Sequence, residues 1–252
     1  MSSIFEKITD AQKSGKTCAL CTITKTEGST PRKAGSKMLV YKDLQIEGSI
    51  GGGALESECI KNAQAVLMSN KPQLFVHQLE KDHQMSCGGF VEIFIEPLNI
   101  QKKLYIFGGG HVGKALSEFA TLLNFQVTVI DSRKEIIENY ANKNIKTLNL
   151  DIKSAFEILP FDEHVFICTA THEHSGDREV IMNALTKKYC YLGMIGSTRK
   201  VAKTKQILQE NGFSNQQINS IDMPMGIAIK CETPEEIAIS IVAKLIDVRL
   251  SI

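Results

Sequence analysis

The sequence predicts an α/β protein in which a smaller N-terminal α+β domain precedes a Rossmann-like, doubly wound parallel sheet. Strands and helices alternate along residues 101–252, which is the pattern of parallel βα units. The glycine-rich segment Gly108–Gly113 joins one of these strands to a helix. Before residue 100, short strand-like runs surround glycine-rich loops instead. The change lies near residues 96–99, so we expect one domain over residues 1–100 and a second over residues 101–252.

The N-terminal domain is expected to mix helices with short strands. Ser3–Gly15 has helical spacing, and Thr17–Lys25 has the composition of a strand. A hairpin is predicted around Lys42–Leu44, with strands over residues 36–41 and 45–50. Gly51, Gly52 and Gly53 then end the second of these strands, because glycine loses the most conformational entropy in a strand. The remaining predicted elements are a helix over residues 54–68 and strands over residues 73–79 and 90–95.

The second domain is expected to begin with a buried strand over Lys103–Phe107, which is a run of mostly apolar residues. An apolar helix follows to about Leu123, and a second strand, Gln126–Ile130, ends at Asp131. Two further strands, helices between them and a C-terminal helix complete the alternation; they are predicted over residues 165–169, 189–194 and 234–249.

The composition excludes several classes of protein. With 43% hydrophobic and 23% charged residues, the chain has the makeup of a globular protein rather than of a disordered tail, a collagen-like fibre or a coiled-coil rod. Its 29 Lys and Arg against 28 Asp and Glu leave a net charge of +1. This charge provides no overall field for nucleic acid or for an anionic membrane surface, so neither is expected as a partner.

The N-terminal residues and the cysteines together indicate a reduced, cytoplasmic location. Residues 1–10 carry Glu6, Lys7 and Asp10 and no apolar segment of the kind found in signal peptides. No apolar run approaches the roughly 18 residues that a membrane helix needs. The cysteine count of 7 is odd, and the density is too low for a small secreted scaffold.

The Gly108–Gly113 segment has the spacing of a dinucleotide-binding turn. Gly108 permits the tight turn, Gly110 lets a pyrophosphate approach the backbone, and Gly113 lets the helix pack closely on the strand. Asp131 lies 21 residues after Gly110, at the end of the next strand, where its carboxylate can accept hydrogen bonds from a ribose. The motif does not distinguish NAD from a pterin dinucleotide, since both contain a pyrophosphate and a ribose. The alternative is a turn of this shape that holds no nucleotide.

Two loops of the N-terminal domain have the composition of anion sites. One spans residues 27–37 and contains Arg32, which can bind a phosphate with two parallel hydrogen bonds. The other spans residues 48–56, contains three consecutive glycines and leads through Glu56 into a helix. The simpler interpretation is two connecting turns with solvated charges.

Cys87 is the candidate reactive cysteine. It is followed by two glycines in Met85–Phe90, which keep the surroundings of its sulfur open, so its thiolate can act as a nucleophile or as a soft metal ligand. The alternative is a small buried hydrophobic residue. Cys18 and Cys21 lie an odd number of residues apart on a strand, which puts their sulfurs on opposite faces and disfavours a shared zinc site. The other cysteines are expected in the core: Cys59, Cys168, Cys190 and Cys231.

Polar residues follow two of the strands in the second domain, where such folds bind ligands. His172, His174 and Asp177 are candidate acid–base groups or metal ligands. The alternative is capping of the next helix by Ser175 or Asp177, with exposed histidines. After the following strand, Ser197 or Thr198 is expected to cap a helix whose Arg199 meets an anion, and Lys200 is expected to be a surface cation.

The motifs taken together resemble the XdhC/CoxI family of molybdenum-hydroxylase maturation proteins. The resemblance covers almost the whole chain, and its motifs follow in order at residues 28–32, 48–56, 86–89, 107–113, 171–177, 195–200, 224–229 and 233–238. It implies a chaperone that binds molybdenum cofactor, protects it while the cofactor receives its terminal sulfur, and delivers it to an apo-hydroxylase of the xanthine dehydrogenase type. A cysteine desulfurase is then a further expected partner.

The same resemblance suggests a division of labour among the candidate residues. Arg32 and the glycine loop through Glu56 would hold the phosphate or pyrophosphate of the cofactor, and Cys87 would ligate its molybdenum. The nucleotide or pterin portion would lie in the cleft of the second domain; the expected cofactor-binding residues there are Gly108, Gly110, His111, Gly113, Asp131, His172, His174, Asp177, Ser197 and Arg199. Whether the cargo is molybdopterin or its cytosine dinucleotide form stays open.

Two other interpretations fit the sequence. An NAD(P)-dependent oxidoreductase would use the same turn and Asp131, although only the histidine segment offers it acid–base groups. A nucleotide-responsive module without cargo is the second alternative. A homodimer is expected under the chaperone interpretation, because it would cover edge strands and bring two half-sites together.

Overall fold

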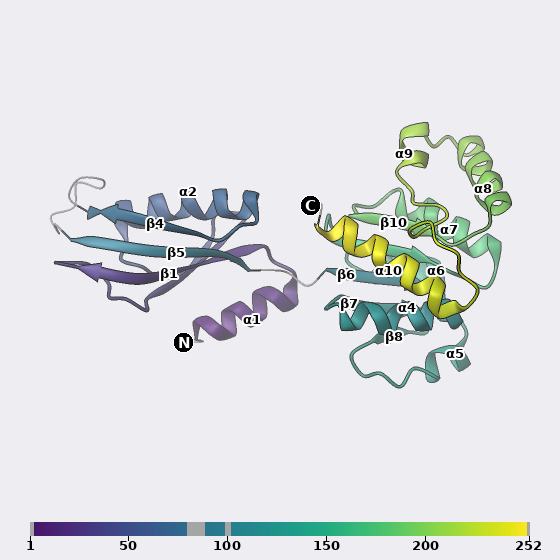
Figure 1. The fold of residues 1–252 in the computed structure, drawn as a ribbon, viewed down its shortest axis with the longest axis horizontal. Helices are drawn as coiled ribbons and strands as arrows, with labels where there is room; N and C mark the ends of the chain where they lie inside the picture. The colour runs from purple at the N-terminus through teal and green to yellow at the C-terminus, as the bar shows by residue number, and fades with distance from the viewer. Residues whose placement is uncertain (1–2, 80–88, 99–101, 251–252) are drawn as a thin grey trace. The chain divides into compact units, whose positions relative to one another are not determined.

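The computed structural model describes residues 3–79, 89–98 and 102–250, and the chain divides into two compact units, Met1–Gln101 and Lys102–Ile252. The first unit contains an antiparallel sheet with helices, and the second contains a parallel sheet with helices (Figure 1). The predicted α/β fold class, with a Rossmann-type sheet after a smaller α+β part, is therefore confirmed. Each unit is described by itself.

The first unit is built on a sheet with the strand order β3-β2-β1-β5-β4, in which all neighbours are antiparallel. β2 and β3 form the predicted hairpin. The strands are β1 (Cys18–Glu27), β2 (Lys37–Tyr41), β3 (Ile46–Gly48), β4 (Gln73–Gln78) and β5 (Phe90–Leu98). The helices are α1 (Ile4–Ser14) and α2 (Gly53–Ser69).

Helices α1 and α2 cover opposite faces of this sheet (Figure 1). Leu55 and Ala63 of α2 pack with Cys21 of β1, whereas α1 packs against the face that carries Cys18. The alternation of β1 therefore puts Cys18 and Cys21 on opposite faces, as predicted, and they cannot share a metal ion. Ser3 caps α1, and Gly15 ends it in the left-handed conformation.

The second unit is built on a sheet with the strand order β10-β9-β6-β7-β8, in which all neighbours are parallel. The strands are β6 (Lys103–Phe107), β7 (Gln126–Ile130), β8 (Lys146–Leu148), β9 (Val165–Thr169) and β10 (Tyr191–Met194). The helices are α4 (His111–Leu122), α5 (Lys134–Glu138), α6 (Ile152–Ile158), α7 (His174–Ala184), α8 (Thr198–Glu210), α9 (Asn215–Asn219) and α10 (Pro234–Leu250). The predicted start of the last strand at Tyr189 is wrong, since β10 begins at Tyr191.

Helices cover both faces of the parallel sheet. Leu116 of α4 and Leu245 of α10 pack on one face, with Ile106 and Val129 of the sheet. Phe156 of α6 and the apolar residues of α7 and α8 pack on the other face. The strand order reverses direction between β6 and β9, so the loops that follow these strands diverge and leave a crevice at the carboxyl edge of the sheet, where such folds bind ligands.

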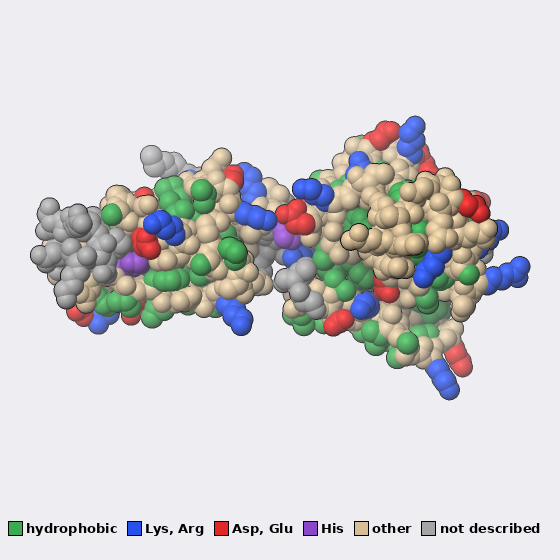
Figure 2. Space-filling model, turned by 90° about the horizontal axis from the view of Figure 1, so that it is seen from above, with side chains coloured by type: hydrophobic (Ala, Val, Ile, Leu, Met, Phe, Trp, Pro, Cys, Tyr) green, Lys and Arg blue, Asp and Glu red, His purple; other side chains and the backbone are tan. Residues whose placement is uncertain are grey.

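The surface agrees with the near-zero net charge. Figure 2 shows Lys and Arg side chains interspersed with Asp and Glu on the face in view, rather than gathered into a region of one sign. Within the described ranges, no helix combines the length and apolarity needed to cross a membrane.

Candidate functional site

The glycine turn after β6 has the steric features of a nucleotide-binding turn. Gly108 has a φ of +108°, and a Cβ there would overlap the carbonyl of Ala170. A Cβ at Gly113 would overlap the carbonyl oxygen of Gly108, so α4 can approach β6 only because Gly113 has no side chain. A Cβ at Gly110 meets no atom within 4 Å, which leaves the backbone open to a ligand at the start of α4.

Asp131 connects this turn to the end of β7. Its Oδ2 accepts a hydrogen bond of 2.8 Å from the Gly109 N–H, and the Arg133 guanidinium donates to both oxygens, at 2.9 Å from Nε and 2.7 Å from Nη2. Burial alone would raise the pKa of Asp131, but the hydrogen bonds from Arg133 and Gly109 outweigh it and hold the pKa below its ordinary value. Asp131 is therefore an ionised group whose oxygens are already in use, and a ribose hydroxyl would have to share them with Arg133.

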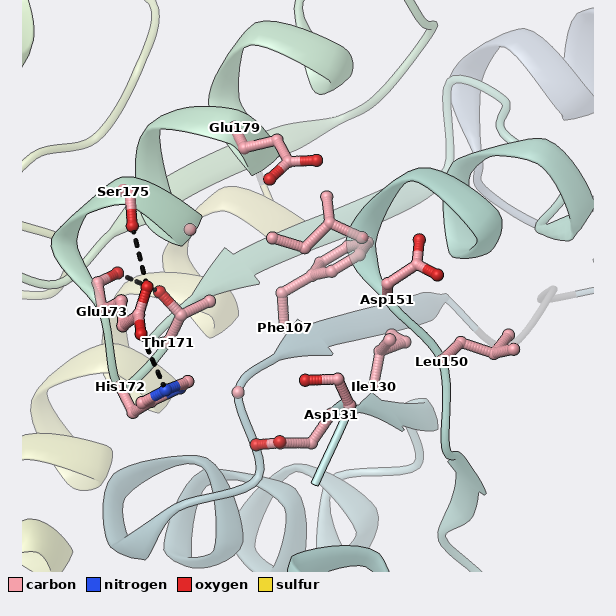
Figure 3. A pocket seen from close by; sticks show the side chains of 14 residues that line it. Phe107, Ile130, Asp131, Leu150, Asp151, Thr171, His172, Glu173, Ser175 and Glu179 are labelled. Atoms are coloured by element: carbon pink, nitrogen blue, oxygen red, sulfur yellow. Dashed lines mark hydrogen bonds and ion pairs between the residues drawn. The ribbon is translucent and has the colours of Figure 1, made fainter. Parts of the chain in front are cut away.

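A pocket of about 240 Å³ opens beside this turn at the carboxyl edge of the sheet (Figure 3). It is formed by the ends of β6 and β7, the segment between β8 and α6, the segment between β9 and α7, and the first residues of α6 and α7. Its apolar lining is Phe107, Ile130, Leu150 and Ile152, and its polar side chains are Asp131, Ser132, Asp151, Thr171, His172, Glu173, Ser175 and Glu179. Gly108, Asp131 and His172 are the predicted site residues that line it.

Most acidic side chains of the pocket already have partners. Asp151 caps α6 by accepting hydrogen bonds from the Ser154 N–H at 2.8 Å and from its Oγ at 2.9 Å. Glu173 accepts from the Ser175 Oγ at 3.1 Å and lies 3.5 Å from the Nε2 of His172, a half-exposed side chain. For the carboxylate of Glu179, the described part of the chain provides no hydrogen-bond or ion-pair partner.

Asp177 lies beneath the loop after β9 and does not line the pocket. Its Oδ1 accepts hydrogen bonds from the Thr169 Oγ1 at 2.6 Å and the Thr171 N–H at 2.9 Å, and its Oδ2 is ion-paired with Lys200. The prediction that Lys200 is a surface cation is therefore wrong, because this ion pair draws its amine into the interior. Asp177 holds together the segments that follow β9 and β10.

The first residues of α7 and α8 test the helix caps that the sequence predicts. Ser197 caps α8, as predicted, by accepting from the Lys200 N–H at 3.3 Å. Glu173 is the N-cap of α7 and makes no side-chain cap, so the alternative in which Ser175 or Asp177 caps this helix is wrong. Arg199 is exposed on α8, His111 is exposed at the start of α4, and His174 begins α7. Neither Arg199 nor His111 lines the pocket, and the side chain of His174 lies outside the described part of the structure.

A second cluster forms in the first unit, where three sequence motifs meet. A Cβ at Gly51 would overlap the ring of Pro31, and one at Gly89 would overlap the backbone of Ser29 and the side chain of Thr30. The motifs at residues 28–32, 48–56 and 86–89 are thus in contact through the described residues. Arg32 is exposed in this cluster. Cys87 lies outside the described residues.

Glu56 organises the glycine loop of this cluster. Its carboxylate accepts hydrogen bonds from the Ser49 Oγ at 2.6 Å and from the N–H groups of Gly52 at 2.9 Å and Ile50 at 3.1 Å. Burial would raise the pKa of Glu56, but these hydrogen bonds outweigh it and lower the pKa. Gly51, Gly52 and Gly53 have φ values of +136°, +82° and +63°, and a Cβ at Gly52 or Gly53 meets no atom within 4 Å. The backbone at the start of α2 is therefore accessible.

The described cysteines are mostly poor nucleophiles. Burial raises the pKa of Cys18 to about 11 and raises that of Cys168, and a hydrogen bond with Cys59 together with burial raises the pKa of Cys21. Cys59 and Cys168 lie in the core as predicted, and Cys190 is partly buried and packs against it. Cys231 is partly exposed, so the prediction is wrong for this cysteine. Among the described residues, no group of three or more His, Cys, Asp or Glu side chains is placed to hold a metal ion.

Family models match both units. Residues 104–245 match the XdhC Rossmann domain, and residues 11–78 match the XdhC and CoxI family. The chain belongs to the XdhC family. The resemblance drawn from the motifs is thereby confirmed.

Individual XdhC relatives match over different shares of their length. The uncharacterized protein YqeB of Escherichia coli strain K12 is 32% identical over 98% of this chain, which covers 46% of YqeB. A Bacillus subtilis strain 168 protein, named as a probable xanthine dehydrogenase subunit, is 29% identical over 62% of this chain and 46% of its own length. The molybdenum cofactor insertion chaperone PaoD of E. coli K12 is 23% identical over 98% of this chain and 88% of its own length. The chain thus spans about half the length of the first two relatives.

A solved structure shares the fold of the whole chain. The crystal structure of a xanthine dehydrogenase from Bacillus halodurans aligns with a TM-score of 0.54 at 22% identity, over 99% of this chain and 96% of that one.

Proposed function

We propose that this XdhC-family protein binds molybdenum cofactor, protects it while it receives its terminal sulfur, and delivers it to an apo-hydroxylase of the xanthine dehydrogenase type. The relative PaoD, which is named a molybdenum cofactor insertion chaperone, matches over most of both chains and supports this proposal. The B. subtilis relative, by its xanthine dehydrogenase name, supports the class of the client enzyme.

The observation that carries the proposal is the meeting of three motifs in the first unit. Pro31 contacts Gly51, and Ser29 and Thr30 contact Gly89, so the proposed phosphate-binding loops adjoin the described end of the cysteine motif. Arg32 is exposed and can pair with the phosphate of the cofactor, and the open space beside Gly52 and Gly53 leaves room for that phosphate. The Cys87 thiolate is the proposed soft ligand of its molybdenum.

The second unit is proposed to hold the rest of the cofactor, a pterin or a cytosine nucleotide. The open backbone at Gly110 suits a pyrophosphate, and Asp131 and His172 line the neighbouring pocket. A cysteine desulfurase that supplies the sulfur is a proposed partner. A homodimer is also proposed, because β4 and β8 are edge strands that a second copy of the chain could cover.

An NAD(P)-dependent oxidoreductase is the second candidate function. The turn at Gly108, Gly110 and Gly113 favours it, because its steric features suit any dinucleotide. NADH fluorescence on titration, followed by a substrate-dependent change in nicotinamide absorbance, distinguishes this candidate from the chaperone.

A transfer assay tests the chaperone function. The protein is loaded with cofactor and mixed with an apo-hydroxylase, and the recovery of hydroxylase activity is compared with recovery from free cofactor. The wild type is expected to speed recovery, and Arg32→Glu is expected to slow it by about 10-fold, since one charge-assisted pair with a phosphate is worth about 1.5–3 kcal/mol. Lys71→Glu makes the same charge change at an exposed residue after α2 and serves as the control. Recovery no faster than with free cofactor would contradict the proposal.

A further inference from the structure

We propose that the pocket of the second unit binds a flat, amino-substituted heterocycle whose exocyclic amine donates to Glu179 and Asp151, and that it rejects phosphate. The inference rests on the proposed function and deepens it, because pterin and cytosine both carry such an amine. Adenine carries one as well, so the chemistry is shared by three sources.

The apolar lining of the pocket suits a planar ring. Leu150 and Ile152 are partly exposed and offer apolar surface to the pocket, and the buried side chains of Phe107 and Ile130 close it on the core side. Figure 3 shows Phe107, Ile130 and Leu150 around this space. The ring of Phe107 is held in place by stacking on Phe156, at a centroid distance of 5.0 Å and an interplanar angle of 11°. The pocket volume of about 240 Å³ admits one or two fused rings, since a cavity of about 150 Å³ holds benzene.

The charges of the pocket are of one sign. Its charged side chains are Asp131, Asp151, Glu173 and Glu179, and the guanidinium of the neighbouring Arg133 is engaged by Asp131. Among the described lining residues no cation is free, so a phosphate in this pocket would face carboxylates and be repelled. The phosphate of a bound nucleotide would therefore have to lie outside the pocket, and the open backbone at Gly110 offers a place for it.

Two carboxylates remain to accept hydrogen bonds from a ligand. Glu179 on α7 has no partner in the described part of the chain, and Asp151 has spare lone pairs beyond those used by Ser154. Figure 3 shows Glu179 and Asp151 on two sides of the space above Phe107, and both line the pocket, so a ring bound there would lie between them. Both carboxylates can accept further hydrogen bonds, and an exocyclic amine has two N–H groups that can donate them.

These carboxylates are not arranged as a metal site. In the parts of the chain that the structure describes, no three His, Cys, Asp or Glu side chains are grouped closely enough for one ion. The donors that fit them are therefore the N–H or O–H groups of an organic ligand, and an exocyclic amine on a flat ring supplies such N–H groups.

Matched pairs of ligands test the inference by calorimetric titration of the full chain. Pterin is paired with lumazine, cytidine with uridine and adenosine with inosine, because each second member replaces the amine by a carbonyl. We expect at least one amino member to bind 10-fold or more tightly than its oxo partner, since a carboxylate accepts from an amine and faces a carbonyl unpaired. The pair with the largest preference identifies the source of the ring.

Substitution of the acceptor completes the test. Glu179→Gln can donate to a carbonyl and is expected to reduce the preference by about 10-fold, whereas Glu157→Gln, at an exposed residue of α6 outside the pocket, keeps it. NADP, with its extra 2′-phosphate, is expected to bind no more tightly than NAD. Equal binding within all three pairs, or a preference that Glu179→Gln leaves unchanged, would overturn the inference.

The outcome separates the inference from the proposed function. A protein that carries cofactor but shows no amine preference contradicts only the pocket assignment. A protein that prefers adenosine over inosine through Glu179 but transfers no cofactor supports the pocket assignment and contradicts the chaperone.

Discussion

Lys200 at the start of α8 forms an ion pair with Asp177 at the start of α7, and the two side chains are 11% and 0% exposed. The same carboxylate accepts hydrogen bonds from Thr169 and Thr171, at the end of β9 and just after it. One buried carboxylate thereby fixes the segment that carries His172 and Glu173 into the pocket. Lys200, which pairs with Asp177 to stabilise this segment, comes 23 positions after Asp177 in the chain.

Removing Lys200 is expected to be costly. Lys200→Met leaves the Asp177 carboxylate buried without its counter-ion, which typically lowers the free energy of unfolding by about 3–5 kcal/mol. Urea unfolding followed by circular dichroism measures the loss. The double variant Lys200→Met with Asp177→Asn should recover part of it, because no charge is then left buried.

Lys203→Met provides the control for this experiment. Lys203 is an exposed residue of the same helix, so its substitution should change the free energy of unfolding by less than about 0.5 kcal/mol. Equal losses for Lys200→Met and Lys203→Met would show that the buried pair does not stabilise the second unit.

Glu56 is expected to make the first unit sensitive to acid. Its pKa is lowered in the folded protein, so its contribution to stability is present above its unfolded pKa of about 4.3 and is lost as the pH falls through the lower, folded value. Glu56→Gln should therefore cost about 1 kcal/mol at pH 7 and progressively less below about pH 4. Urea unfolding of both proteins between pH 3 and 7 measures the difference. A cost that stays constant over this range would contradict the proposed role of the charge.

The glycines of the nucleotide turn are expected to differ sharply in tolerance. Gly113→Ala places a Cβ against the carbonyl oxygen of Gly108 and should cost about 1–3 kcal/mol or more through overpacking. Gly110→Ala enters open space and should change stability little. Thermal unfolding of the two variants distinguishes them, and similar midpoints would contradict the packing derived for α4.

A bulky side chain at Gly110 tests the cleft itself. Gly110→Trp should fold, because no atom lies within 4 Å of a Cβ there, yet it should block a ligand at the start of α4. Cofactor binding is expected to fall by about 10-fold or more relative to Gly110→Ala. Unchanged binding would place the cofactor in the first unit alone.

The sequence predicted well the strands that are continuous runs of apolar residues. The strands Lys103–Phe107, Gln126–Ile130 and Val165–Thr169 have the predicted bounds, because buried parallel strands are continuous apolar runs. The three-residue strand β8 and the short helix α6 leave no such pattern, so neither was predicted. Asp151, which lies between them, was therefore missed as a pocket residue.

The site depends more strongly on contacts that local patterns do not encode. Gly108 and Asp131 were predicted, because a motif of fixed spacing carries them. Glu179 lies in the middle of α7, where a surface glutamate is ordinary, and only the fold turns it toward Phe107. Lys200 was assigned to the surface because its partner Asp177 belongs to another helix.

The cargo itself tests the account most directly. The protein is purified from a host that makes molybdenum cofactor, and molybdenum and oxidised-pterin fluorescence are measured for the wild type, Cys87→Ala and the control Cys231→Ala. The account predicts stoichiometric pterin and molybdenum in the wild type and the control, with the metal lost in Cys87→Ala. No pterin and no molybdenum in the wild type, with the cofactor supply of the host verified, would contradict it.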